Sequence, residues 1–438
     1  MTDAYVRSSD EVIKLTPNDQ HTNQEYVDGW RAGAVLVALF LVSAISQVDR
    51  ILPFIMAEAI KAELSLSDTQ IGLLTGVAFA VCYSLLSLPL ARLSDRSSPR
   101  FVLFLCILAW SAMTALGGLA ASFMLLAFSR FGVAFGEAGA TPAGHAIIAR
   151  KIRPERRGLA IGLFAMGIPL GTMIGFAAGG AISDTLGWRT ALIGAGATGG
   201  LIALMTISLI GPTPRLQTSI IKSEPFLQAS LRLLSSPGFR WLFIGALASS
   251  FAAAPFYAFG APFLMRTHGL SASEAGLAFG LLQGLMGIFG TLLGGRGFDR
   301  AVRSGTGRVL GPPGILFLLS SATATAALFT PVVWISIALL VPTMLSFAFM
   351  LPWGFGAAHL VAGKGKEAMA TSLVMMGSGL LGPAFGPLVV GMISDAATAA
   401  QLPNGLGFGL LTVPVASVLT GFAFLIANRR VAATLQSR

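Results

Sequence analysis

The chain has 438 residues, of which 54% are hydrophobic and only 11% are charged, and its formal net charge is +10. Soluble domains carry about 25% charged residues, so this composition argues against a soluble enzyme, a disordered protein and a nucleic-acid-binding domain. Apolar runs of about 20 residues recur along the chain, a length that crosses a ~30 Å hydrocarbon core. The sequence therefore predicts an all-α integral membrane protein.

We expect twelve transmembrane helices. They lie at residues 31–56, 69–91, 100–120, 123–150, 158–182, 190–211, 238–265, 272–296, 306–326, 332–361, 367–393 and 407–428. The polar segment 1–30 has no basic stretch followed by an apolar core, so it is predicted to be a tail and not a cleaved signal peptide. Residues 429–438 form a second tail in this prediction.

One long linker, residues 212–237, divides the helices into an N-terminal bundle at 31–211 and a C-terminal bundle at 238–428. Apolar residues within the linker fall at helical spacing, namely Phe226, Leu227, Leu231 and Leu234. This spacing predicts an amphipathic helix on the membrane surface, with Ser223 as its cap and Pro225 in its first turn.

Lys and Arg are distributed unevenly between the two sets of predicted loops. Most of the 29 lie in one set or at the termini, whereas the opposite loops hold only Lys61, Arg189 and Arg266. Because cytoplasmic loops are enriched in Lys and Arg, both termini are predicted to be cytoplasmic. The short loops of the opposite side favour a bacterial inner membrane.

The two bundles repeat in sequence. Leu66–Leu73 matches Leu270–Leu277, and Ile182-Ser183-Asp184 matches Ile393-Ser394-Asp395. Six helices return the chain to the same side, so the copies are expected to be parallel repeats around an axis along the membrane normal. Such repeats suit alternating access, with a site near the midplane between them.

Two loops resemble the signature of the major facilitator superfamily. Leu93-Ser94-Asp95-Arg96 is followed by Arg100, and the second copy reads Gly295–Arg300; Ala91 and Ser98 stand where glycines are usual. Four further features resemble the spinster-like branch: Asp49-Arg50, Arg130, Gly136-Glu137-Ala138 and the glycine-rich run after Pro169. The branch includes exporters of sphingosine phosphate and lysolipids, and the resemblance implies a bacterial transporter with the major facilitator fold.

Four charges fall inside predicted helices, where each costs about 2.5–3.5 kcal/mol or more near the bilayer centre. Asp49 and Arg130 are each about 10 Å from the outer helix ends, so their equal depth allows an ion pair between them. Glu137 lies two turns from Arg130 on the same face. Arg50 points about 100° away from Asp49. A static ion pair that holds the first and fourth helices together is the alternative to a functional role.

From these positions we predict three sets of site residues. Proton coupling is assigned to Glu137, Asp49 and His145, because a carboxylate held between burial and a nearby arginine can load and release a proton. Gating is assigned to Asp95, Arg96, Asp299 and Arg300, on the family resemblance. Substrate binding is assigned to the charged residues and to aromatic residues of the C-terminal half, namely Arg130, Arg50, Glu137, Tyr257, Phe259 and Trp353.

Each assignment has a structural alternative. His145 can be a packed neutral histidine, the aromatic residues can face lipid or pack helices, and Asp95 can be a solvated turn residue whose exposed pairs contribute little. Cys82 and Cys106 lie in apolar runs and are expected to be packing residues and not a disulfide. No spacing indicates a metal site, a phosphate loop or a nucleophile with its base.

The sequence thus predicts a proton-coupled secondary transporter for an anionic amphiphile such as a lysophospholipid or a sphingolipid phosphate. A transporter of a soluble organic anion or a drug is the second hypothesis, and a transport-dead receptor or scaffold the third. The expected partners are a small amphipathic or anionic substrate, protons and membrane lipid. We expect a monomer without cofactor, metal or nucleic acid.

Overall fold

The computed structural model describes residues 26–213, 226–304, 309–362 and 367–436. Within them, twelve helical segments are long and apolar enough to span a membrane. The first half comprises α1 (Gly29–Ile55), α2 (Ala57–Leu64), α3 (Asp68–Gly72), the π-helix η1 (Leu73–Val77), α4 (Ala78–Arg96), α5 (Pro99–Gly118), α6 (Phe123–Lys151), the 3₁₀ turn η2 (Pro154–Arg156) and α7 (Arg157–Leu209). The second comprises α8 (Phe226–Ser235), α9 (Pro237–His268), α10 (Ala272–Arg303), α11 (Gly311–Phe329), α12 (Val333–Ala362), α13 (Glu367–Ala399), α14 (Gly405–Leu410) and α15 (Thr412–Gln436).

The expected all-α membrane fold is confirmed, with differences at the element ends. Gly187, with φ of 83°, turns α7 sharply, so this one helix supplies two spans. The short helix α2 was not predicted. Residues 429–436 are helical and continue α15 beyond the predicted end of the last span at residue 428. The predicted linker helix corresponds to α8, while Ser223 and Pro225 lie outside the described residues.

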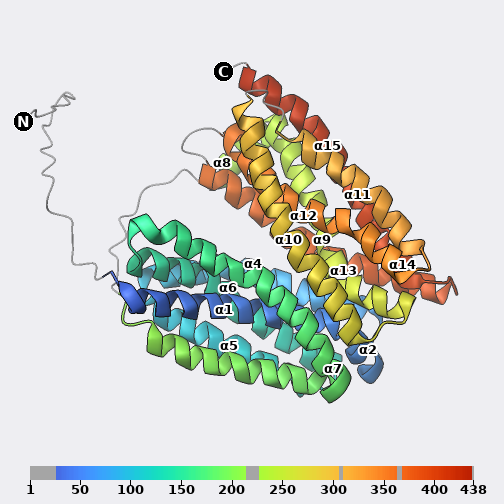
Figure 1. Cartoon of the computed structure of the whole chain (residues 1–438), viewed down its shortest axis with the longest axis horizontal. Helices are drawn as coiled ribbons and strands as arrows, with labels where there is room; N and C mark the ends of the chain where they lie inside the picture. Colours follow the sequence, from blue (N-terminus) through green and yellow to red (C-terminus); the bar gives the residue numbers. More distant parts are fainter. Residues whose placement is uncertain (1–25, 214–225, 305–308, 363–366, 437–438) are drawn as a thin grey trace, which may run out of the picture.

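The helices form two bundles, α1–α7 and α9–α15, joined through α8 (Figure 1). The bundles approach each other at the end that carries α2 and α14, which we call the closed end. They diverge toward the end that carries α8, which we call the open end (Figure 1). The contacts that decide this arrangement lie at the closed end.

Two glycines allow the bundles to touch there. A Cβ at Gly180 of α7 would lie 2.2 Å from the carbonyl oxygen of Ala272, and one at Gly391 of α13 would lie 2.3 Å from that of Asp68. The two glycines occupy equivalent positions of the sequence repeat, as do Ala272 and Asp68. The closed end is therefore built from two pseudo-symmetric contacts, each between a helix and the N-terminus of a helix in the other bundle.

Substitution Gly180→Ala is expected to weaken the closed end, because the added methyl meets backbone that cannot rotate away. Overpacking of this kind typically costs about 1–3 kcal/mol. Spin labels on Leu186→Cys and Leu402→Cys, which are exposed at this end in different bundles, would report a longer distance. The native cysteines are buried and leave the labelling selective. The matched change Gly200→Ala in α7 meets open space and should leave the distance unchanged; equal distances in both variants would contradict the prediction.

Candidate functional site

A buried ion pair joins α1 to α6 in the N-terminal bundle. Arg50 donates to one oxygen of Glu137, from Nη2 at 2.7 Å and from Nε at 3.1 Å. The Glu137 side chain has no exposed surface, whereas 32% of the Arg50 side chain is exposed. Arg50 therefore connects a fully buried carboxylate with the space outside the bundle.

The ion pair that equal depth allows between Asp49 and Arg130 is not formed. Arg130 instead donates from Nη1 to the backbone oxygen of Asp49 at 3.4 Å, and the Asp49 carboxylate accepts no hydrogen bond. Both side chains are buried. The reason is the rotation of α1: neighbouring residues on a helix point about 100° apart, and here Arg50 faces Glu137. Arg50, which points about 100° away from Asp49, is therefore the residue that forms an ion pair, and its partner is Glu137.

Two aromatic residues of α4 complete this charged group. The Arg50 guanidinium carbon lies 4.8 Å from the ring centre of Phe79 and 5.0 Å from that of Tyr83. The Arg130 guanidinium lies 5.1 Å from the same Phe79 ring. Both arginines thus receive cation–π contacts in place of water. Sequence reasoning missed Phe79 and Tyr83, although their spacing of four residues places them on one helix face.

His145 lies apart from the ion pair. Its side chain is exposed, and its ring packs edge-on against Phe164 with 5.5 Å between centres. No hydrogen bond links it to Glu137, eight residues earlier on α6. The predicted extension of a proton path through His145 has no contact to support it in this conformation.

The predicted aromatic wall is mostly inside the C-terminal bundle. Phe259 has no exposed surface and Trp353 only 2%, so neither lines a substrate site in this conformation. Trp353 packs between Phe298 and Phe349, with 5.7 Å between ring centres in each case. Tyr257 is only half-buried, and its ring lies edge-on to Phe347 at 5.8 Å.

The predicted gating residues lie near the open end. Arg96, Asp299 and Arg300 are exposed and form no ion pair within the described residues, and the Asp95 side chain lies outside the described part. The turn after α4 is fastened by Arg150 of α6, which donates to the backbone oxygens of Ser94 at 3.0 Å and Ser97 at 3.1 Å. This turn is therefore held within its own bundle.

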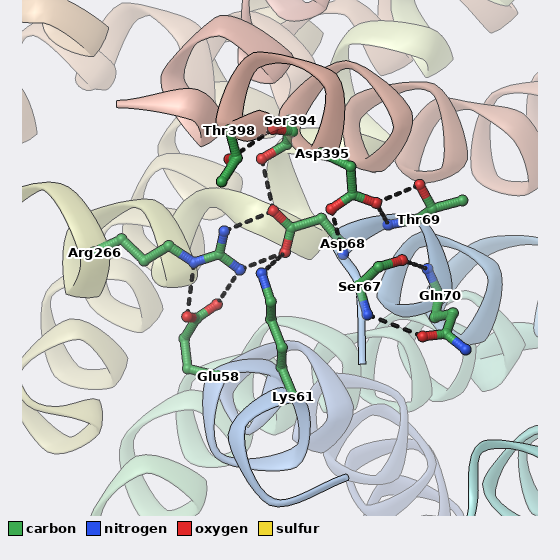
Figure 2. Close-up of polar contacts among 10 residues, drawn as sticks. All are labelled: Glu58, Lys61, Ser67, Asp68, Thr69, Gln70, Arg266, Ser394, Asp395 and Thr398. Carbon is green, nitrogen blue, oxygen red and sulfur yellow. Dashed lines mark hydrogen bonds and ion pairs between the residues drawn. The ribbon is translucent and has the colours of Figure 1, made fainter. Parts of the chain in front are cut away.

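The strongest polar contacts between the bundles lie at the closed end, in a group that we call the Asp68 cluster (Figure 2). It consists of Glu58, Lys61, Asp68, Arg266 and Ser394. Arg266 of α9 donates to both oxygens of Asp68 at 2.6 and 2.7 Å and to both oxygens of Glu58 at 2.7 Å. Lys61 and Ser394 each reach Asp68 at 2.6 Å. Asp68 itself is only 1% exposed, so it is a buried carboxylate that joins both bundles.

Two helix caps also join the bundles at the closed end, and one of them adjoins this cluster. Asp395 of α13 accepts hydrogen bonds from the backbone nitrogens of Asp68 at 2.9 Å and Thr69 at 2.8 Å (Figure 2). Asp184 of α7 accepts equivalent bonds from the backbone nitrogens of Ala272 at 3.3 Å and Ser273 at 2.7 Å. Each carboxylate caps the N-terminus of a helix in the other bundle, where negative charge is favoured.

The two caps are related by the repeat, but the ion cluster is not. Ala272 occupies the position equivalent to Asp68, so one of the two contacts lacks the central carboxylate. Sequence reasoning matched Asp184 with Asp395 as equivalent positions of the repeat. It did not infer that each of them caps a helix of the other bundle. The sequence also held a signal for the ion cluster, namely the rarity of basic residues in the loops at this end. All three of them, Lys61, Arg189 and Arg266, form ion pairs in the structure. Among the described residues no group of three or more His, Cys, Asp or Glu could hold a metal ion.

Two repeated six-helix bundles that meet at one end and contain buried charges in one half define a membrane transporter, not an enzyme. The profile of the Major Facilitator Superfamily matches residues 38–387, and the chain belongs to this family.

The chain is similar along most of its length to several transporters and to solved transporter structures. The chain is 33% identical to an MFS-type efflux pump of Mycolicibacterium smegmatis, over 91% of this chain and 93% of that protein. It is 25% identical to a probable L-galactonate transporter of Escherichia coli, over 91% of each chain. A bacterial homologue of the human lysosomal transporter Spinster, crystallised in an inward-facing and unoccupied conformation, superimposes with a TM-score of 0.79 at 28% identity, covering 94% of this chain and 98% of that one. The predicted resemblance to the spinster-like branch is thereby confirmed.

Proposed function

We propose that the protein is a proton-coupled secondary transporter that moves an anionic amphiphile by alternating access. The observation that carries the proposal is the Arg50–Glu137 pair, in which a buried carboxylate holds an arginine that is partly exposed. A guanidinium binds carboxylates and phosphates through paired hydrogen bonds. An anionic head group and the ionised Glu137 would therefore compete for Arg50.

This competition couples the substrate to a proton. When Glu137 gains a proton it loses its charge, and Arg50 becomes free to bind the anion. When the anion leaves, Glu137 can release its proton and take Arg50 back. Asp49 and Arg130 lie beside this pair and supply a second carboxylate and a second cation. The membrane interior of the C-terminal bundle has no charged residue, which suits the apolar tail of an amphiphile.

Alternating access would proceed through the closed end. With both termini in the cytoplasm of a bacterial cell, as the distribution of Lys and Arg favours, the closed end faces outward. The present conformation would then be inward-facing. Opening to the outside requires that Arg266 leave Asp68 and that Asp184 and Asp395 leave the helices they cap.

Substitution Glu137→Gln is expected to abolish the response of transport to a pH gradient, because an amide carries no exchangeable charge for Arg50. Flux of anionic lysolipids in proteoliposomes with and without an imposed pH gradient measures this, and the stimulation by the gradient should be lost. Glu155→Gln, an exposed carboxylate of η2, is the matched control and should behave as wild type. An unchanged pH response in Glu137→Gln would remove this residue from the mechanism.

A soluble organic anion is the second candidate substrate, favoured by the similarity to the L-galactonate transporter. The same flux assay separates the two. Transport of sugar acids without transport of lysolipids would keep the Arg50–Glu137 mechanism and replace the amphiphile.

A further inference from the structure

A small cavity of about 20 Å³ lies inside the N-terminal bundle, between Asp49 and the closed end. Its walls come from five parts of the bundle: α1, the segment from α2 to η1, α5, α6 and the last part of α7. Most of the lining is apolar, including Ile60 and Leu126. Three of the lining side chains, however, carry polar atoms without partners.

These three side chains are Asp49, Arg130 and Thr114. Both carboxylate oxygens of Asp49, Nε and Nη2 of Arg130 and the hydroxyl of Thr114 make no hydrogen bond. All three residues are at most 4% exposed. An unpartnered polar group in such a place costs about 1–3 kcal/mol, so three around one cavity form an unusual concentration.

The other hydroxyls of the cavity do not share this property. Thr75 donates to the backbone oxygen of Ile71 at 2.8 Å, and Ser129 to that of Leu126 at 2.8 Å. They are satisfied by their own helices. A buried water needs roughly 10–15 Å³ and two to four polar partners, and this cavity offers both.

We propose that the cavity is a binding site for one ordered water, which is shared by Asp49, Arg130 and Thr114. Arg130 donates an N–H to the water oxygen, and the water donates one hydrogen to the Asp49 carboxylate. The Thr114 hydroxyl forms the third hydrogen bond of the water. The charged groups that face Asp49 are Arg130 and, behind it, the Arg50–Glu137 pair, because the lining residues from α5, η1 and α7 are uncharged.

The site has a consequence for transport, and this part rests on the proposed function. The water lies on the closed-end side of Asp49, beside Ile60 and Ile71. When the closed end opens, a hydronium ion entering there can pass a proton to this water while the water passes one of its own to Asp49. Asp49 would then exchange protons with the outside and Glu137 would hold the substrate side.

The proposal is tested by comparing substitutions of two buried threonines, of which only one lines the cavity. Thr114→Val keeps the side-chain shape and removes the hydroxyl that faces the cavity. Thr206→Val is the matched control, since Thr206 in α7 is fully buried, has an unpartnered hydroxyl and does not line the cavity. In a dry protein both changes remove an unsatisfied group, and both should leave the melting temperature unchanged or raise it.

With a bound water, the two variants should differ. Thr206→Val should keep or raise the melting temperature, whereas Thr114→Val should lower it and should slow proton-driven flux by up to about tenfold, the worth of one hydrogen bond. A map of the wild-type protein that resolves buried waters should contain a peak within hydrogen-bonding distance of Asp49, Arg130 and Thr114. An empty cavity in such a map, or identical behaviour of the two variants, would overturn the inference.

The inference and the proposed function can fail separately. Asp49→Asn tests the function through the pH dependence of flux, while the map tests the water. A water that is present together with an unchanged pH dependence in Asp49→Asn contradicts the proton route and leaves the binding site intact. A dry cavity together with lost pH dependence contradicts the site and leaves proton coupling intact.

Discussion

Asp68→Asn is expected to shift the protein strongly toward a conformation in which the closed end is open. The neutral amide cannot compensate the positive charges of Arg266 and Lys61, whose nitrogens both lie within 2.7 Å of the Asp68 carboxylate. Breaking a buried pair costs about 3–5 kcal/mol, and the lower part of this range applies because about a quarter of each cation is exposed. Lys61 belongs to the same bundle as Asp68, so only the loss of the Arg266 contact falls on the closed state alone. That loss should change the equilibrium by on the order of 100-fold. The spin-label distance between Leu186→Cys and Leu402→Cys measures it.

Glu63→Gln is the matched control for this prediction. Glu63 of α2 pairs with Arg189 of α7 at 2.9 Å and accepts a hydrogen bond from Trp188 at 2.6 Å. These contacts lie at the same end of the molecule but inside one bundle, so they should not report on bundle separation. If Asp68→Asn keeps the wild-type distance, or if Glu63→Gln lengthens it equally, the Asp68 cluster does not hold the closed end together.

The second large effect is expected at the Arg50–Glu137 pair. Arg50→Met should destabilise the protein, because it leaves the fully buried carboxylate of Glu137 without its partner. The cost should lie near the lower end of about 3–5 kcal/mol, since Arg50 is partly exposed. The double variant Arg50→Met with Glu137→Gln should recover much of the loss, because two neutral side chains can share the buried site. Unfolding in detergent, followed through all four variants, measures the coupling energy.

The exposed pair Arg153–Asp28 offers the comparison for this cycle. Both side chains are more than half exposed, and such pairs typically contribute about 0.2–1 kcal/mol. A cycle of Arg153→Met and Asp28→Asn should therefore show weak coupling. Comparable coupling in the two cycles would mean that burial adds nothing to the Arg50–Glu137 pair, and a static helix-to-helix contact of ordinary strength would suffice to explain it.

The buried charges illustrate how far sequence reasoning reaches within a site. Asp49, Arg50, Arg130 and Glu137 could be selected because any charge in an apolar span is costly and therefore conspicuous. Their pairing could not be selected, because helix depth is encoded by position along the chain but the rotation of α1 against α6 is decided by packing. The equal depth of Asp49 and Arg130 in the membrane suggested that these two residues pair. The rotation of α1 instead brings Arg50 to Glu137.

The closed end shows the same division over longer distances. Asp68 and Arg266 are 198 positions apart, and no local pattern indicates that they meet. The repeat did relate Asp184 to Asp395, but symmetry in sequence says nothing of which residues touch across the axis. Likewise, Phe259 and Trp353 have the aromatic character of a binding wall, yet both are turned into the C-terminal bundle.

The sequence by itself determined the membrane-spanning helices, their division into two repeated halves and the small set of buried charges, because hydrophobic length, repetition and misplaced charge are properties of the chain read in one dimension. The tertiary structure alone decided which charges pair, which aromatic residues keep exposed surface and which end of the bundles is closed. These depend on the rotation and approach of helices, and they are set by the summed packing of many distant side chains and by glycines that let backbones touch.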